Sequence, residues 1–338
     1  MVFQNAELYN VQAMVATGRQ EYRLSRVPEE VRLKLNQRAQ VMAFNGCGTE
    51  IRFNLLGDRA KILLKREKAD GLVSPYGIVE VYQGCFPGRY EISPQCIGVE
   101  PTEIIIPKFN TEVLQKIAAE NKSAFDPKLI RVLLPYDWSY YLMNIEGEIV
   151  PPQLGQTPGT KYLAYGSSIT HGGGAVSPSG GYAARLAQML KTDLINLGFA
   201  GAAFLEEELA DYIAARNDWD IATLELGINV IEDWDVEFFA QKADYFISKV
   251  AKSSPDKWIF CTDIFTCGRD FTNHPKIESY RNTVRNIVEK LNMPKLVYIC
   301  GRDLLKTGAL LSSDGTHPSD RGMQEIAENF YEAMKTKV

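Results

Sequence analysis

The chain has 338 residues, a length that usually corresponds to two domains. Hydrophobic residues make up 45% of it and charged residues 23%, the balance of an ordinary soluble globular protein. Its net charge of −5 excludes a positively charged surface spread over the whole molecule, so we expect no nucleic-acid partner.

The N-terminal sequence MVFQNAELYNVQ has no basic region followed by an apolar stretch, so we expect no signal peptide. No run approaches the roughly 18 apolar residues that span a membrane. We therefore expect a cytoplasmic protein without a membrane partner. The cysteines lack CxxC spacing and are expected to be buried thiols rather than disulfides or metal ligands. They are Cys47, Cys85, Cys96, Cys261, Cys267 and Cys300.

The first 150 residues are expected to form an N-terminal β-sandwich domain of the jelly-roll type. Short segments rich in Ile, Val and Leu alternate apolar with polar positions, as half-buried strands do, and Gly, Pro and Asp separate them. These segments are 50–55, 60–65, 77–82, 102–107 and 129–134. One helix is expected near 110–121. The Pro- and Gly-rich segment 147–160 is expected to be a linker.

From residue 160 to 338 the pattern changes to a regular alternation of strand and helix. The predicted strands cover 161–166, 193–198, 220–227, 257–263 and 295–300, and the predicted helices cover 182–190, 206–216, 237–251, 278–291 and 319–335. This alternation predicts a parallel sheet with helices on both faces. Sites in such domains lie beyond the carboxyl ends of the strands, where we find Ser167, Gly198, Gly227 and Asp263.

The segment GSSITHGGG follows the first of these strands and has three possible interpretations. A glycine-rich turn whose serine caps a helix is the most common of them. A phosphate-binding loop is less consistent, because the Gly-Lys-Ser/Thr ending of a P-loop is missing. A nucleophilic serine is the third, although the segment is not the G-x-S-x-G elbow of α/β-hydrolases.

A nucleophilic serine needs a base, and the chain has only three histidines. His274 lies in a polar stretch and is expected on a surface loop. His171 is three residues from Ser168 and is expected to be structural or to line a pocket. His317 lies between the last strand and the last helix, and Asp314 precedes it by three residues. That spacing allows the carboxylate to hold the imidazole Nδ1 and leaves Nε2 free to accept a proton.

An ester hydrolase also needs hydrogen-bond donors for the oxyanion. Gly201 follows the second strand, and its backbone N–H can face the site. Asn229 follows the third strand and offers a side-chain amide. Each residue alone is explained by ordinary turn chemistry. Together with Ser168 and His317, they form an ordered series at the ends of four strands.

These residues resemble the SGNH (GDSL-like) hydrolase family over about residues 160–338. The four blocks of the family correspond here to GSSIT, FAGAA, GIN and DGTHP. The resemblance implies a flavodoxin-like three-layer α/β fold and a Ser-His-Asp esterase that needs no metal or organic cofactor. It implies Ser168 as nucleophile, His317 as base and Asp314 as the acid that orients it. The oxyanion hole is implied to consist of the N–H groups of Ser168 and Gly201 and the Asn229 side chain.

The sequence departs from the family pattern at two positions. Ser167 stands where the family usually has Asp, and Val230 follows Asn229 where the family often has Asp. Neither replaced residue performs the chemistry, so activity is still expected, although the loop geometry can differ.

The order of the two predicted domains also resembles that of carbohydrate esterases that remove acetyl groups from sugars. We therefore expect a short-chain esterase whose small-molecule substrate is an acetylated sugar. An acyltransferase with the same triad is one alternative, and a non-catalytic glycan-binding protein is another. The aromatic run 135–142 is more typical of packing between domains than of a sugar platform. The oligomeric state stays open.

Overall fold

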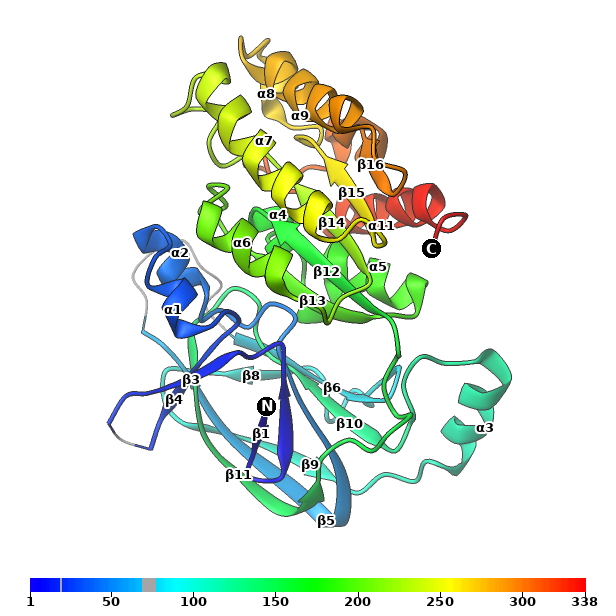
Figure 1. Ribbon diagram of the computed structural model, residues 1–338. Coiled ribbons are helices and arrows are strands. Elements are labelled where there is room, and N and C mark those ends of the chain that lie inside the picture. The colour runs from blue at the N-terminus through cyan, green and yellow to red at the C-terminus, as the bar shows by residue number, and fades with distance from the viewer. Residues whose placement is uncertain (19, 69–76) are drawn as a thin grey trace.

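The computed structural model describes residues 1–18, 20–68 and 77–338. It has two parts, a curved β-structure built from the first 150 residues and an α/β part stacked on it (Figure 1). No helix in the described part of the chain is long and apolar enough to cross a lipid bilayer.

The N-terminal part is a β-sandwich in which the long strand β5 belongs to both layers. One end of β5 pairs with β10 and the other with β9, while β11 follows it on both sides of a bulge. The predicted sandwich is confirmed, but the two strands predicted at 50–55 and 60–65 are one continuous strand. The strands are β1 Val2–Phe3, β2 Ala6–Tyr9, β3 Ala13–Ala16, β4 Tyr22–Ser25, β5 Glu50–Arg66, β6 Gly77–Gln83, β7 Phe86–Pro87, β8 Gln95–Ile97, β9 Thr102–Pro107, β10 Leu129–Leu133 and β11 Tyr140–Val150.

Three helices interrupt the sandwich. The predicted helix at 110–121 is present as α3 (Glu112–Asn121). The two short helices α1 (Glu29–Arg32) and α2 (Gln37–Met42) were not predicted, because they are too short to show helical periodicity. Both lie against the α/β part of the molecule (Figure 1).

The predicted linker begins later than expected, because β11 continues to Val150. Gly147 has φ +141° and lies in a β-bulge, after which Ile149 pairs with Leu55. The glycine therefore bends a strand instead of ending it, as glycine in a bulge commonly does. The segment between the two sheets is 151–160.

The C-terminal part contains a five-stranded parallel sheet with the order β13-β12-β14-β15-β16. This is the flavodoxin-like order, in which the first strand lies second in the sheet, so the prediction is confirmed. The strands are β12 Lys161–Gly166, β13 Asp193–Gly198, β14 Ile221–Glu225, β15 Trp258–Thr262 and β16 Leu296–Ile299.

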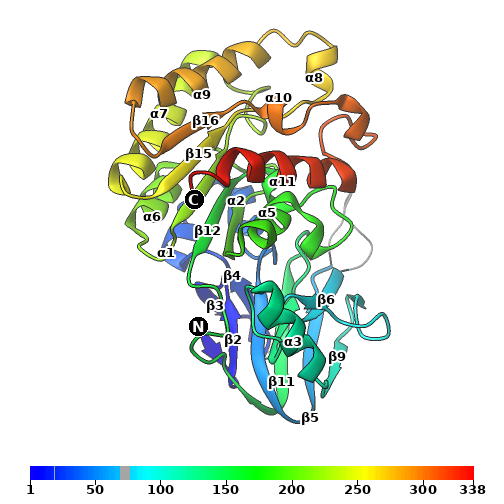
Figure 2. The ribbon, with the colours of Figure 1, turned by 90° about the vertical axis from the view of Figure 1, so that its right-hand side faces the viewer.

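Helices cover both faces of this sheet and make three layers (Figure 2). Helices α6, α7 and α9 pack on one face, and α5 and α11 pack on the other. The helices are α4 Ser168–His171, α5 Tyr182–Leu190, α6 Glu207–Ala215, α7 Val236–Ser253, α8 Gly268–Phe271, α9 Ile277–Leu291, α10 Gly301–Leu304 and α11 Asp320–Met334, with 3₁₀ turns at Pro178–Gly180 and Gly308–Leu310.

A buried ion pair joins the two parts. Arg52 on β5 donates to both carboxylate oxygens of Asp193 at the start of β13, at 2.7 and 2.6 Å. Its Nε donates to Glu50, which also accepts from Arg131. Burial opposes ionisation of Glu50, but Arg131 and Arg52 outweigh this effect and lower its pKa to about 2. Glu50 therefore stabilises the fold above its ordinary pKa, and this contribution is lost as the pH falls toward 2.

A second buried arginine, Arg26, crosses the same interface and has no carboxylate partner among the described residues. Its guanidinium donates to the carbonyl oxygens of Asn45 and Met42 in the sandwich part. It also donates to the carbonyl oxygens of Asn196 and Gly198 at the end of β13, both at 2.9 Å. The sandwich is thus hydrogen-bonded to the end of β13, and the loop that follows this strand carries Gly201.

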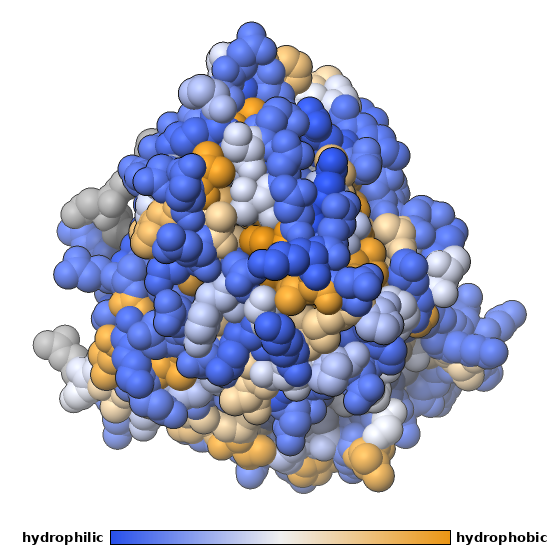
Figure 3. Space-filling view, turned by 45° about the horizontal axis from the view of Figure 1, so that its top comes forward, coloured by the Kyte–Doolittle hydropathy of each residue, from blue (hydrophilic) through white to orange (hydrophobic). Residues whose placement is uncertain are grey.

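The surface is mainly hydrophilic on the face seen in Figure 3, with apolar side chains in small patches between charged ones. All six cysteines are free thiols. The prediction that they are all buried is wrong for three of them. Cys96 is exposed because it lies on the outward face of the short strand β8, between Gln95 and the buried Ile97. The partly exposed thiols are those of Cys85 and Cys300.

Replacing Arg52 by methionine should lower the free energy of unfolding by about 3–5 kcal/mol, because Asp193 is left as a buried charge without its partner. Urea denaturation at neutral pH measures this change. The matched control is Lys61→Met, which breaks the exposed pair with Glu103 and should cost less than about 1 kcal/mol. Equal losses in the two variants would contradict a structural role for the Arg52 pair.

Candidate active site

The two adjacent serines after β12 have different environments. Ser167 is 1% exposed, and its Oγ accepts a hydrogen bond from the Ile169 N–H at 3.1 Å, which caps α4. Ser168 is the first residue of α4 and is only partly buried. The capping interpretation therefore holds for Ser167, while the Ser168 hydroxyl remains available for chemistry.

The structure brings Ser168, His317 and Asp314 together. The His317 Nε2 atom lies 2.7 Å from Ser168 Oγ, and its Nδ1 atom lies 2.6 Å from Asp314 Oδ2. Partial burial opposes ionisation of Asp314. Hydrogen bonds from the His317 backbone and ring and from the Thr316 N–H outweigh it and lower the Asp314 pKa well below its usual range. An ionised Asp314 fixes the tautomer of His317 and leaves Nε2 to accept the serine proton.

The turn that carries Asp314 and His317 is supported by the short helix α8. The Gly268 N–H at the start of α8 donates to the Gly315 carbonyl oxygen at 2.5 Å. Gly315 itself has φ +67°, a conformation that favours glycine. Asp270 caps the same helix by accepting from the Cys267 N–H at 2.9 Å.

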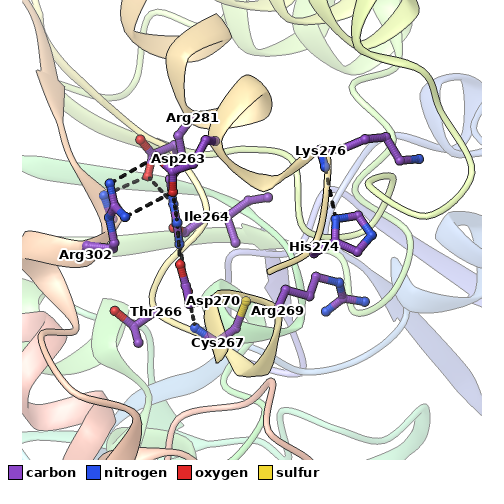
Figure 4. Close-up of polar contacts among 12 residues, drawn as sticks. Asp263, Ile264, Thr266, Cys267, Arg269, Asp270, His274, Lys276, Arg281 and Arg302 are labelled. Carbon is purple, nitrogen blue, oxygen red and sulfur yellow. Dashed lines mark hydrogen bonds and ion pairs between the residues drawn. The ribbon is translucent and has the colours of Figure 1, made fainter. Parts of the chain in front are cut away.

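Asp270 is in turn held by the buried Arg281 (Figure 4). The Arg281 guanidinium is 1% exposed and donates to the two Asp270 oxygens at 2.5 and 3.0 Å. It also donates to the carbonyl oxygens of Ile264 and Phe265, which follow β15. These contacts tie the turn of the histidine to the end of β15, and no local sequence pattern indicated them.

The predicted oxyanion donors lie on two loops that meet beyond the end of β12. Gly201 has φ +61°, and Asn229 Oδ1 accepts from the Ala203 N–H at 3.1 Å. This bond orients the Asn229 amide and leaves its Nδ2 donor without a partner among the described residues. The N–H groups of Ser168 and Gly201 likewise donate to no other described group. The three residues thus offer three unused donors, as an oxyanion hole requires.

Glu225, the last residue of β14, was missed by the sequence analysis. It is 2% exposed, and its Oε2 accepts from the Ser167 N–H at 2.6 Å and from the Thr170 hydroxyl at 3.0 Å. Burial raises the pKa of this carboxyl group, and the hydrogen bonds from Ser167 oppose the rise. Glu225 thus supplies a carboxyl group to the serine turn, in which Ser167 replaces the family's Asp. The sequence contained one signal for this role, an acidic residue at the end of an otherwise uncharged buried strand.

His171 has a structural place, as expected. It is 2% exposed, and its ring nitrogens lie 2.9 Å from the Gly198 carbonyl oxygen and 2.5 Å from the Tyr136 carbonyl oxygen. Burial, with a further contribution from Arg26, lowers its pKa to about 3. The two carbonyl contacts oppose this shift, and they join α4 to both parts of the molecule. Within the described ranges, no group of His, Cys, Asp and Glu side chains is arranged to hold a metal ion.

The fold and these contacts define a class of protein, the flavodoxin-like α/β domains with a serine, a histidine and an aspartate at the carboxyl edge of the sheet. The sequence profile of the GDSL-like lipase/acylhydrolase family matches residues 160–335. The chain belongs to this family, which confirms the resemblance found in the sequence. A search of curated proteins found no match.

Solved structures share the complete two-part architecture. The salicylyl-acyltransferase SsfX3 from a tetracycline biosynthetic pathway is similar with a TM-score of 0.80 and 17% identity, over 98% of this chain and 95% of that one. A family two carbohydrate esterase from Clostridium thermocellum, in complex with cellohexaose, has a TM-score of 0.59 and 16% identity, over 87% and 93% of the two chains. The family two carbohydrate esterase from Cellvibrio japonicus has a TM-score of 0.60 and 11% identity, over 98% and 96%. At these identities the likeness establishes the fold.

Replacing Glu225 by glutamine should lower the free energy of unfolding by about 1–3 kcal/mol, because an amide nitrogen, which cannot accept a hydrogen bond, replaces one oxygen of the carboxyl group that binds the Ser167 N–H and the Thr170 hydroxyl. The serine turn should also lose its geometry, so kcat for an ester should fall while the fold persists. Denaturation and steady-state kinetics measure the two effects. Glu289→Gln, at an exposed position on α9, is the control. A Glu225→Gln variant as stable and active as the control would show that the carboxyl group is dispensable.

Proposed function

We propose that this protein is a serine esterase that hydrolyses short-chain esters, acetyl esters above all, of a carbohydrate. The observation that carries the proposal is the continuous chain of contacts from Asp314 through His317 to Ser168. The serine is accessible, the histidine has a free nitrogen directed at it, and the carboxylate is held in its ionised form. A cytoplasmic location remains a prediction.

The reaction proceeds through an acyl-enzyme. Ser168 Oγ attacks the ester carbonyl carbon while His317 Nε2 accepts the hydroxyl proton. The oxyanion that forms accepts hydrogen bonds from the N–H groups of Ser168 and Gly201 and from Asn229 Nδ2. The protonated His317 then gives its proton to the leaving alcohol. Water, activated by the same nitrogen, attacks the acyl-enzyme, releases the acid and restores the serine.

The carbohydrate part of the proposal is supported by the shared architecture with family two carbohydrate esterases. The aromatic run before the linker gives no support, because Trp138 is 3% exposed and Tyr140 is fully buried. Tyr136 of the same run packs against Gly172, and its hydroxyl donates to the Ala175 carbonyl oxygen at 2.8 Å. The run therefore packs within and between the two parts, as the sequence analysis favoured, and sugar recognition must involve other residues.

A second candidate is an acyltransferase with the same three residues, in which an acceptor alcohol replaces water. The likeness to SsfX3, which extends over nearly the whole of both chains, supports the acyltransferase as the second candidate. The two functions differ in the partition of one acyl-enzyme between water and an alcohol. Product analysis of an activated acetyl ester, with and without sugar alcohols at millimolar concentration, separates them.

Ser168→Ala should abolish ester hydrolysis and covalent labelling by a fluorophosphonate, while thermal melting shows an intact fold. Ser167→Ala should keep the nucleophile and lose only a helix cap, a cost of about 0.5–2 kcal/mol in stability. If Ser167→Ala is inactive and Ser168→Ala is active, the nucleophile is Ser167 and the assignment to Ser168 is wrong. An unlabelled wild-type protein would support a non-catalytic glycan-binding role instead.

Asn229→Ala should lower kcat by about 10²–10³, the usual cost of one oxyanion donor. The loss should appear in kcat with KM nearly unchanged, because the hydrogen bond strengthens as charge develops on the oxygen. Steady-state kinetics with a p-nitrophenyl ester provide the test. A change confined to KM would mean that Asn229 binds the substrate and not the transition state.

A further inference from the structure

The sandwich part places one arginine at the edge of the candidate oxyanion hole. A Cβ atom on Gly201 would lie 2.5 Å from Cζ and 2.5 Å from Nη2 of Arg38, so the guanidinium rests directly against the glycine. Any side chain at position 201 would displace it. Gly201 is thus required for its positive φ angle and also for the close approach of this cation.

Arg38 reaches this position because its helix is anchored to the loop it covers. Asn36 caps α2 by accepting from the Ala39 N–H at 2.9 Å. The Asn36 Nδ2 atom donates to the Ala202 carbonyl oxygen at 3.1 Å and to the Glu206 carboxylate. Arg38 follows two residues later on the same short helix. The contacts therefore hold the arginine from the sandwich over the loop that follows β13.

The Arg38 guanidinium has no ionic partner in the described part of the chain, although other arginines of the molecule do. Arg32 on α1, for example, is paired with Glu29. Glu206, which lies on the loop that α2 covers, is bonded to Asn36 instead, and burial raises the pKa of that carboxyl group. Arg38 itself is exposed to solvent. Among the described residues, the Arg38 guanidinium is thus a fork of N–H donors without a partner, beside the loop of the proposed oxyanion hole.

We infer that Arg38 recognises an anionic group on the alcohol portion of the substrate, so that the enzyme prefers acetyl esters of acidic sugars. A carboxylate, phosphate or sulfate pairs well with the planar donors of arginine. An acetyl group has only a methyl group beyond its carbonyl carbon and cannot carry the charge. The inference rests on the proposed esterase function and names the substrate class for that same site. It also gives the sandwich a direct part in substrate selection.

The test compares a matched pair of substrates, a mono-acetylated methyl glucoside and the corresponding mono-acetylated methyl glucuronide, which differ in one carboxylate. The wild-type enzyme should prefer the glucuronide in kcat/KM, and Arg38→Gln should reduce this preference about 10- to 100-fold, mainly through KM. Arg38→Lys should restore part of it, because lysine keeps the charge without the fork. The preference should also weaken as salt is added. Arg89→Gln, at an exposed position of the sandwich, is the control and should keep the wild-type ratio.

Three results would overturn the inference. Equal losses on the two sugars in Arg38→Gln would show that the arginine acts on the oxyanion or on the fold, and thermal melting separates these. An unchanged ratio would show that it contacts no anion. A loss found only with p-nitrophenyl hemisuccinate, relative to p-nitrophenyl butyrate, would place the charge on the acyl portion.

Failure of the esterase proposal itself gives a different result, namely no hydrolysis of any ester and no labelling of Ser168. In that case the anion site is tested by binding alone. Calorimetric titration of Ser168→Ala with the two acetylated sugars should show tighter binding of the glucuronide, and the double variant with Arg38→Gln should lose the difference. Equal binding of both sugars to Ser168→Ala would overturn the inference without reference to catalysis.

Discussion

The candidate active site depends on one contact, the approach of His317 Nε2 to Ser168 Oγ, which joins residues 149 positions apart in the chain. It forms because both residues follow strands of one parallel sheet, and the carboxyl ends of such strands share an edge. Strand β12 lies between β13 and β14, so Ser168 projects between the loops of Gly201 and Asn229. Two buried groups support this arrangement. Glu225 accepts a hydrogen bond from the serine turn, and Arg281 holds Asp270, which caps the helix that contacts the histidine turn.

The sandwich is bound to the catalytic part by buried charged groups. Arg52 pairs with Asp193 at the start of β13, and Arg26 binds the carbonyl oxygens at its end. The strand is thus held at both ends, and the loop after it carries Gly201. A buried ion pair such as Arg52–Asp193 adds little net stability, but it is costly to break, so it fixes one relative position of the two parts. That fixed position is what allows Arg38 on the short helix α2 to lie against Gly201.

Much of the α/β part could be predicted from the sequence, because its strands are short apolar runs and its helices have a regular apolar face. The contact between Ser168, His317 and Asp314 could be predicted because these residues follow the first and the last strand of one parallel sheet. The continuity of β5 could not, since Gly57 and Asp58 look like a turn but lie within the strand, where its register with β11 shifts. Helix α2 is six residues long and too short for a periodic signal. The contacts of Arg38, Arg281 and Glu225 depend on residues distant in the chain, which no local pattern records.

In the proposed mechanism, Ser168 carries the acyl group between two half-reactions. Mass spectrometry of the protein, quenched in acid within the first turnover of p-nitrophenyl acetate and digested, tests it directly. We expect one added acetyl group on the peptide that contains the serine turn. Fragmentation should assign it to Ser168, and it should disappear as the substrate is consumed. Turnover without an acetylated serine, or an acetyl group on Ser167 or elsewhere, would contradict the claim.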